Sequence, residues 1–140
     1  MAGKRSVQAR WDGGLRAVVD AGGFELVVDE PESVPGGTGT GPQPTEYLLA
    51  AVASCFALAL AHSAGKRGVE LAEDLRVEAT GTYDGPRFSA IAIDVRVSAP
   101  AGDELATLIA AAQRVCYVTR TLAGSPELSV LVDGRVAAGR

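Results

Sequence analysis

Cysteine and histidine are scarce in this chain of 140 residues, which has two cysteines and one histidine. Cys55, Cys116 and His62 lack the paired spacing of zinc ligands, so we expect no metal site. The glycine-rich run 36–41 lacks both the Gly-Lys-Ser/Thr ending of a phosphate-binding loop and the spacing of a dinucleotide-binding motif. No nucleophile elbow is present, which argues against a hydrolase. The sequence therefore predicts no cofactor, and a lid or dimer loop is the better interpretation of the glycine run.

An excess of basic residues is also missing. Lys and Arg total 13 against 17 Asp and Glu, which gives a net charge of −4 and a pI of about 5.0. The basic residues are scattered along the chain, so no positively charged face is predicted. We expect no nucleic-acid partner.

Long apolar runs are absent as well. The longest, Tyr47 to Ala61, spans about 15 residues, fewer than the ~20 that a transmembrane helix needs. The first residues, Met1 to Trp11, lack the apolar core of a signal peptide. We therefore expect a cytoplasmic protein without a membrane partner. In that compartment, two cysteines are more often thiols than a permanent disulfide.

What the sequence does have is alternation of apolar and polar residues, which predicts strands. Two turn signals, Ala21-Gly22-Gly23 and Asp84-Gly85, join neighbouring strands as hairpins and make the pairing antiparallel. The predicted strands are 7–11, 15–20, 24–29, 75–83, 90–97 and 127–136.

Two helices are predicted. The first begins at Pro44, which suits a first helical turn, and runs to about Lys66 before Gly68. The second begins at Asp103 and carries an apolar stripe that ends at Cys116. Between strands and first helix, residues 31–44 form a loop rich in glycine and proline. The order of elements predicts an α+β fold in a single domain, residues 1–140, with a mainly antiparallel sheet.

The two cysteines admit two interpretations. Both lie on apolar helix faces and point inward, so each could be a small buried hydrophobe. Alternatively, one is a reactive thiol, which needs a nearby cation to favour its thiolate. Arg16, Arg114 and Arg120 are candidate cations, and their spacing does not choose among them. Cys55 and Cys116 are 61 positions apart, so only tertiary folding could bring them together.

Glu46 is a candidate carboxylate to fix such a cation, but it stands nine residues before Cys55. On an ideal helix the two fall on opposite sides, ~13 Å apart along the axis. If both serve one site, Glu46 acts from a bent helix start or from a second subunit.

The sequence resembles the OsmC/Ohr family, the osmotically inducible protein C and organic hydroperoxide resistance proteins. Gly41-Pro-Gln-Pro-Thr-Glu-Tyr-Leu-Leu-Ala-Ala51, continuing to Cys55, is similar to the family's Pro-x-Glu-Leu-Leu-x-Ala-Ala…Cys helix. Val115-Cys-Tyr-Val-Thr-Arg-Thr-Leu122 is similar to its second cysteine segment, and Leu15-Arg-Ala-Val18 to its arginine strand. Tyr117 replaces the usual proline. Glu46, rather than the residue at Thr45, carries the carboxylate, as in branches other than Ohr.

The resemblance implies an OsmC-like fold in which a long central apolar helix lies buried in an intertwined homodimer. It implies that Cys55 is the peroxidatic thiol and Cys116 the resolving thiol. It further implies that Arg16 activates the thiolate and that Glu46 positions the guanidinium.

The implied activity is a thiol peroxidase. It would reduce organic hydroperoxides, and hydrogen peroxide as a further substrate, through a Cys55 sulfenic acid and a Cys55–Cys116 disulfide. In the family, a dithiol, typically a lipoyl group, resets the enzyme. Apolar neighbours such as Leu48, Val52 and Phe56 favour organic substrates. The alternative is a non-catalytic stress-related or ligand-binding protein on the same fold, with inert buried thiols.

Overall fold

A computed structural model of the chain describes residues 3–136, which divide into two compact units, residues up to 51 and residues from 52. The first unit holds strands β1 (Gln8–Trp11), β2 (Ala17–Ala21) and β3 (Phe24–Val28), which pair as an antiparallel meander. Gly22 and Gly23 both have positive φ and form the two-residue turn between β2 and β3, as the sequence predicts.

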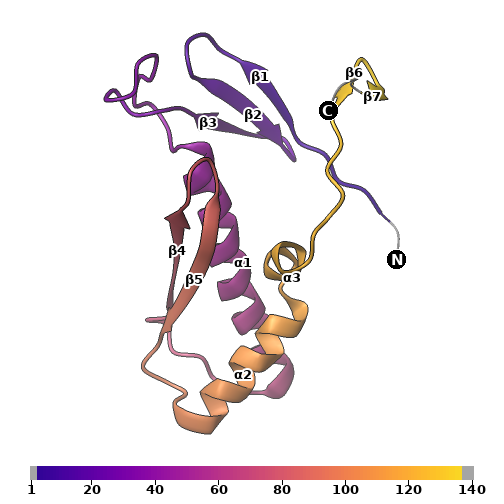
Figure 1. Cartoon of the computed structure of the whole chain (residues 1–140). Helices are drawn as coiled ribbons and strands as arrows, with labels where there is room; N and C mark the ends of the chain where they lie inside the picture. The colour runs from indigo at the N-terminus through magenta and orange to yellow at the C-terminus, as the bar shows by residue number, and fades with distance from the viewer. Residues whose placement is uncertain (1–2, 137–140) are drawn as a thin grey trace. The chain divides into compact units, whose positions relative to one another are not determined.

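Helix α1 (Pro44–Arg67) begins in the first unit and ends in the second (Figure 1). Its start has two signals: Pro44 occupies the first helical position, and the Glu46 carboxylate accepts a hydrogen bond from the Gln43 backbone N–H at 2.9 Å. Its end is set by Gly68, whose φ of +66° lies in the left-handed region that follows many helices. The predicted bounds of this helix are confirmed to within one residue.

The second unit adds the hairpin β4 (Arg76–Tyr83) and β5 (Phe88–Arg96) and helices α2 (Gly102–Val115) and α3 (Tyr117–Ala123). The hairpin and α2 pack against the part of α1 that belongs to this unit (Figure 1). Alternate residues of the hairpin, including Val77, Ile93 and Val95, face the core. The core itself is formed by Phe56, Ala59, Leu60, Ala64, Leu108, Ala112 and Cys116.

Three predictions need correction. All pairing is antiparallel as expected, but within residues 3–136 the strands form three separate sheets rather than one. The strand predicted over 127–136 is instead a small hairpin, β6 (Leu131–Val132) and β7 (Arg135–Val136), because Asp133 and Gly134 adopt positive φ and turn the chain. Helix α3 was not predicted. The α+β class with a long apolar helix is confirmed, and the single domain stays a prediction.

Helix α1 is longer than the apolar run in the sequence. It has 24 residues with a mean hydropathy of 1.8 over its best window, which is long and apolar enough to cross a membrane by length and composition. The core helix of a soluble protein meets the same criterion, so the expected absence of a membrane partner stays a prediction. Only 33% of that window is buried within the chain, so much of the helix surface is left uncovered.

Candidate active site

The second unit brings the two cysteines together. Cys55 lies in the middle of α1 and is half-buried, whereas Cys116 lies between α2 and α3 and is fully buried. Both sulfurs are free thiols, and Cys55 packs against the core cluster that contains Cys116, close enough to lower the pKa of the Cys116 thiol. Two residues 61 positions apart in the sequence therefore form a thiol pair, and one member is open to solvent.

Local backbone geometry fixes the position of Cys116. It ends α2 and precedes α3, with φ −77° and ψ 106°, an extended conformation that turns the chain between the helices. The first N–H groups of a helix have no partner within it. The backbone N–H groups of Val118 and Thr119, in the first turn of α3, can therefore donate hydrogen bonds to the Cys116 sulfur. The neutral thiol makes no capping hydrogen bond, so this support acts on the thiolate.

The surroundings of Cys116 have opposing effects on its pKa. Burial raises the pKa, but hydrogen bonds from the Thr119 hydroxyl, the Thr119 N–H, the Cys55 thiol and the Val118 N–H lower it, and the net pKa lies below the ordinary value. In the neutral protein the same Thr119 hydroxyl donates to the Cys116 carbonyl oxygen at 3.3 Å. Neutral hydrogen bonds, not a cation, thus favour the Cys116 thiolate.

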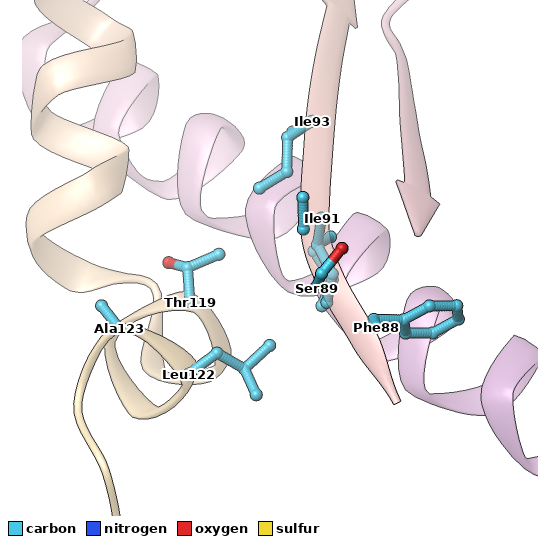
Figure 2. A pocket seen from close by; sticks show the side chains of 9 residues that line it. Phe88, Ser89, Ile91, Ile93, Thr119, Leu122 and Ala123 are labelled. Atoms are coloured by element: carbon cyan, nitrogen blue, oxygen red, sulfur yellow. The ribbon is translucent and has the colours of Figure 1, made fainter. Parts of the chain in front are cut away.

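An apolar cavity of about 410 Å³ lies between β5, α1 and α3, and its lining includes Thr119, which hydrogen-bonds to the Cys116 carbonyl, but neither cysteine. In Figure 2, Thr119 and Leu122 of α3 point towards Ile91 and Ile93 of β5 across it. Val52, which lies three residues before Cys55, and Phe88 complete much of the wall. The wall is mostly hydrocarbon, and Thr119 links it to Cys116. Such a cavity suits an apolar group better than a charged one.

Arg16, the sequence-predicted activator, lies in the first unit and is held on two sides. Its guanidinium forms an ion pair with the Asp12 carboxylate, and its Nε donates to the Thr40 hydroxyl at 2.9 Å. It also lines a cavity of about 380 Å³ together with Trp11 and Leu15. The guanidinium is therefore fixed in direction while 29% of the side chain stays exposed.

Asp29, which the sequence analysis did not select, supports this arginine through Thr40. Its buried carboxylate accepts hydrogen bonds from the hydroxyls of Thr38 and Thr40 and from the backbone N–H groups of Glu30, Thr38 and Thr40. The Thr38 and Thr40 hydroxyls, followed by the Thr40 and Thr38 N–H groups, hold the pKa of Asp29 far below its ordinary value, although burial opposes them. Asp29 thereby fixes the glycine-rich loop, which the sequence interpretation left as a lid or dimer loop.

Glu46 is placed differently from Arg16. Its carboxylate caps the start of α1 through the Gln43 N–H, and within residues 3–136 the ion-pair partner of Arg16 is Asp12. The role of Glu46 in positioning the guanidinium stays a prediction. Arg114 and Arg120, the other candidate cations, are exposed on either side of Cys116. Residues 3–136 contain no group of three His, Cys, Asp or Glu side chains that could hold a metal ion.

The sequence of this chain is similar to a known protein family and to a curated protein. The sequence profile of the family described as OsmC-like protein matches residues 37–130, which include both cysteines. An uncharacterized protein of Haloferax volcanii is 28% identical over 123 residues, which cover 86% of this chain and 89% of that protein.

Solved structures show the same fold. An OsmC-like protein from Mycoplasma pneumoniae superposes with a TM-score of 0.76 at 20% identity, over 89% of this chain and 91% of that one. A protein of Vibrio cholerae named for organic hydroperoxide resistance, with captopril bound in one of the active sites, has a TM-score of 0.62. It is 25% identical over 98% of this chain and 97% of that one.

Proposed function

Because the chain belongs to the OsmC-like protein family, we propose that it is a thiol peroxidase that reduces organic hydroperoxides through Cys55 and Cys116. The observation that carries this proposal is that two free thiols lie together in one core cluster, and Thr119 next to Cys116 also lines an apolar cavity. Relatives named for organic hydroperoxide resistance share the fold, which supports the same activity here.

In the first step the half-buried Cys55 meets the substrate, because the fully buried Cys116 is less accessible. The Cys55 thiolate attacks the distal oxygen of R–O–OH, and the O–O bond breaks. The alkoxide takes up a proton and leaves as the alcohol R–OH, and the sulfur becomes a sulfenic acid, Cys55–SOH. The hydroperoxide is reduced by two electrons and the sulfur is oxidised by two.

In the second step the Cys116 thiolate attacks the Cys55 sulfur. A disulfide forms, and hydroxide leaves and is protonated to water. The lowered pKa of Cys116 increases its thiolate fraction near neutral pH, and the existing contact between the two side chains shortens the required movement. This step protects Cys55 from further oxidation.

Arg16 is assigned the role of stabilising the thiolate and the leaving oxygen. A guanidinium presents two parallel donors, which suits a peroxide better than the single point charge of lysine. Support comes from the Asp12 ion pair and the Thr40 hydrogen bond, which hold the guanidinium in one direction.

A dithiol closes the cycle by exchange, in which its two thiols become a disulfide while Cys55 and Cys116 regain their protons. Cys55 is the more exposed of the two sulfurs, so the dithiol attacks there. We propose a lipoyl-type dithiol as this reductant, and the cytoplasm as the compartment.

The activity is tested by stopped-flow consumption of cumene hydroperoxide and of hydrogen peroxide by the reduced protein. The apolar cavity predicts a second-order rate constant at least about tenfold larger for the organic substrate, since burying a few methylene groups exceeds that difference in free energy. Equal rate constants for the two substrates would show that the apolar cavity does not contribute to substrate selectivity. No consumption of either would favour the alternative of inert thiols.

Thr119→Val should slow disulfide closure. The substitution keeps the β-branched shape but removes the hydroxyl that favours the Cys116 thiolate. Because one hydrogen bond to a charged group is lost, we expect closure at pH 6 to be slower by about threefold to tenfold, with the rate restored as pH rises. Thr121→Val on the same helix, where the hydroxyl donates to the Tyr117 carbonyl, is the control. A pH profile identical to that of the unaltered protein would exclude this role.

We also propose that the protein is a homodimer in which α1 of each chain covers that of its partner. A face of α1 is exposed along its length, at Ala50, Ser54, Leu58, Ala61 and Gly65. Leu58 is 71% exposed near the middle of this apolar helix. Apart from Leu58 these residues are small, which allows a second helix to approach closely.

Leu58→Glu should therefore weaken the dimer by about a hundredfold or more, because the lost burial occurs twice in a symmetric interface. Light scattering coupled to size exclusion measures the mass, with Ala101→Glu, a charge added at an exposed site before α2, as the control. A monomeric unaltered protein would contradict the homodimer.

A further inference from the structure

A second cavity, of about 330 Å³, lies where the last turns of α1 meet the last turns of α2. Figure 1 shows α2 crossing the C-terminal part of α1. The cavity is lined by His62, Ser63, Lys66 and Arg67 from α1 and by Arg114 from α2. The His62 side chain is exposed in this chain.

The charge of this cavity is unusual for the chain. Three permanent cations line it and no acidic side chain does, although the protein has a net charge of −4. Four ion pairs occur within residues 3–136, and none of them involves Lys66, Arg67 or Arg114. The three cations therefore have no ion-pair partner among the described residues.

The partial negative charges at the C-terminal ends of α1 and α2 offset only part of this positive charge. A helix C-terminus is equivalent to roughly −0.5 of an elementary charge, so two ends offset about one of the three cations. About two positive charges stay uncompensated around a cavity that also contains the His62 ring. Simple capping of α1 and α2 would need fewer cations than the cavity holds.

We propose that this cavity binds the phosphate group of a small phosphorylated metabolite. A phosphate monoester carries about −1.5 to −2 charges at pH 7, which matches the uncompensated positive charge. Arg67 and Arg114 can each donate two parallel hydrogen bonds to phosphate oxygens, and Lys66 adds a mobile point charge. The volume is in the range of small-molecule sites, so it admits an organic group beyond the phosphate.

The proposal is independent of the thiol chemistry, because none of its residues belongs to the thiol pair or lines the apolar cavity of about 410 Å³. All three cations are exposed, so they can be replaced by glutamine without disturbing the core. The binding test therefore does not depend on peroxidase activity.

Isothermal titration calorimetry of the full-length protein with glycerol 3-phosphate, inorganic phosphate and glycerol tests the proposal. We expect both phosphates to bind and glycerol not to bind, with affinity that falls as salt concentration rises. Arg114→Gln should weaken binding by about tenfold or more. Arg5→Gln, which removes the same charge from an exposed position that does not line the cavity, should leave it unchanged.

Binding of neither phosphate, or equal loss in Arg114→Gln and Arg5→Gln, would overturn the proposal. Thermal unfolding of each variant, followed by circular dichroism, checks that the fold is retained. If Arg114→Gln does not fold, Lys66→Gln provides the same comparison from the other helix.

Discussion

Cys55→Ser should abolish hydroperoxide consumption, with a fall in the second-order rate constant of at least about 10³-fold. A serine hydroxyl is far less acidic than a thiol and is not oxidised by peroxide, so the first step has no nucleophile. Stopped-flow measurements with cumene hydroperoxide on the reduced protein provide the rate. Circular dichroism should be unchanged, because the substitution removes no large group from the core.

Cys116→Ser is the matched comparison, because it removes the other thiol of the pair. We expect the first oxidation to proceed at a similar rate, whereas the sulfenic acid at Cys55 then persists and is oxidised further to the sulfinic acid. Mass spectrometry distinguishes these products. Undiminished turnover in Cys55→Ser, or a disulfide-independent cycle in Cys116→Ser, would end the proposed mechanism.

Asp29→Asn is expected to have the largest effect on stability in the first unit. The carboxylate accepts five hydrogen bonds from a loop with little regular structure. An asparagine amide presents two hydrogens to groups that are themselves donors, which leaves buried polar groups unsatisfied. We expect the midpoint of thermal unfolding to fall by about 5 °C or more. Loss of the Thr40 anchor should also loosen Arg16 and slow peroxide consumption.

The pH dependence of this effect has a definite sign. Asp29 has a pKa in the folded protein far below its ordinary value, so its contribution to stability is fully present above the unfolded-state pKa of about 3.9. That contribution is lost as pH falls towards the folded-state pKa. The difference in unfolding midpoint between the unaltered protein and Asp29→Asn should therefore shrink below about pH 4. Asp20→Asn, the same substitution at an exposed site on β2, is the control.

How far the sequence predicts the fold depends on local signals. Helix α1 is well predicted because Pro44 and Gly68 mark its ends in the sequence, and the β4–β5 hairpin because Asp84-Gly85 marks its turn. Helix α3 has only seven residues and none of them is buried, so no apolar period reveals it. The last hairpin has strands of two residues, too short for alternation to be recognised.

The residues of the candidate site also fall into two groups, those that the sequence identifies and those that it does not. Cys55 and Cys116 stand out by composition, and their inward-facing positions anticipate a contact that tertiary folding then supplies. Thr119 and Asp29 act through partners that a local pattern does not identify. Asp29 binds Thr38 and Thr40, nine and eleven residues further along a loop without periodicity. An acidic residue at the end of the β-rich run 24–29, before a glycine-rich loop, was the available signal for Asp29, and a hydroxyl three residues after Cys116 was the signal for Thr119.

The central claim is that Cys55 and Cys116 are one redox pair within a single chain. Intact-mass analysis after one equivalent of cumene hydroperoxide, under denaturing conditions without reductant, tests it most directly. The account predicts that each chain loses two hydrogen atoms and that digestion yields a single linked peptide containing both cysteines. A chain mass that stays unchanged, that gains oxygen, or that doubles through a bond between two chains would contradict it.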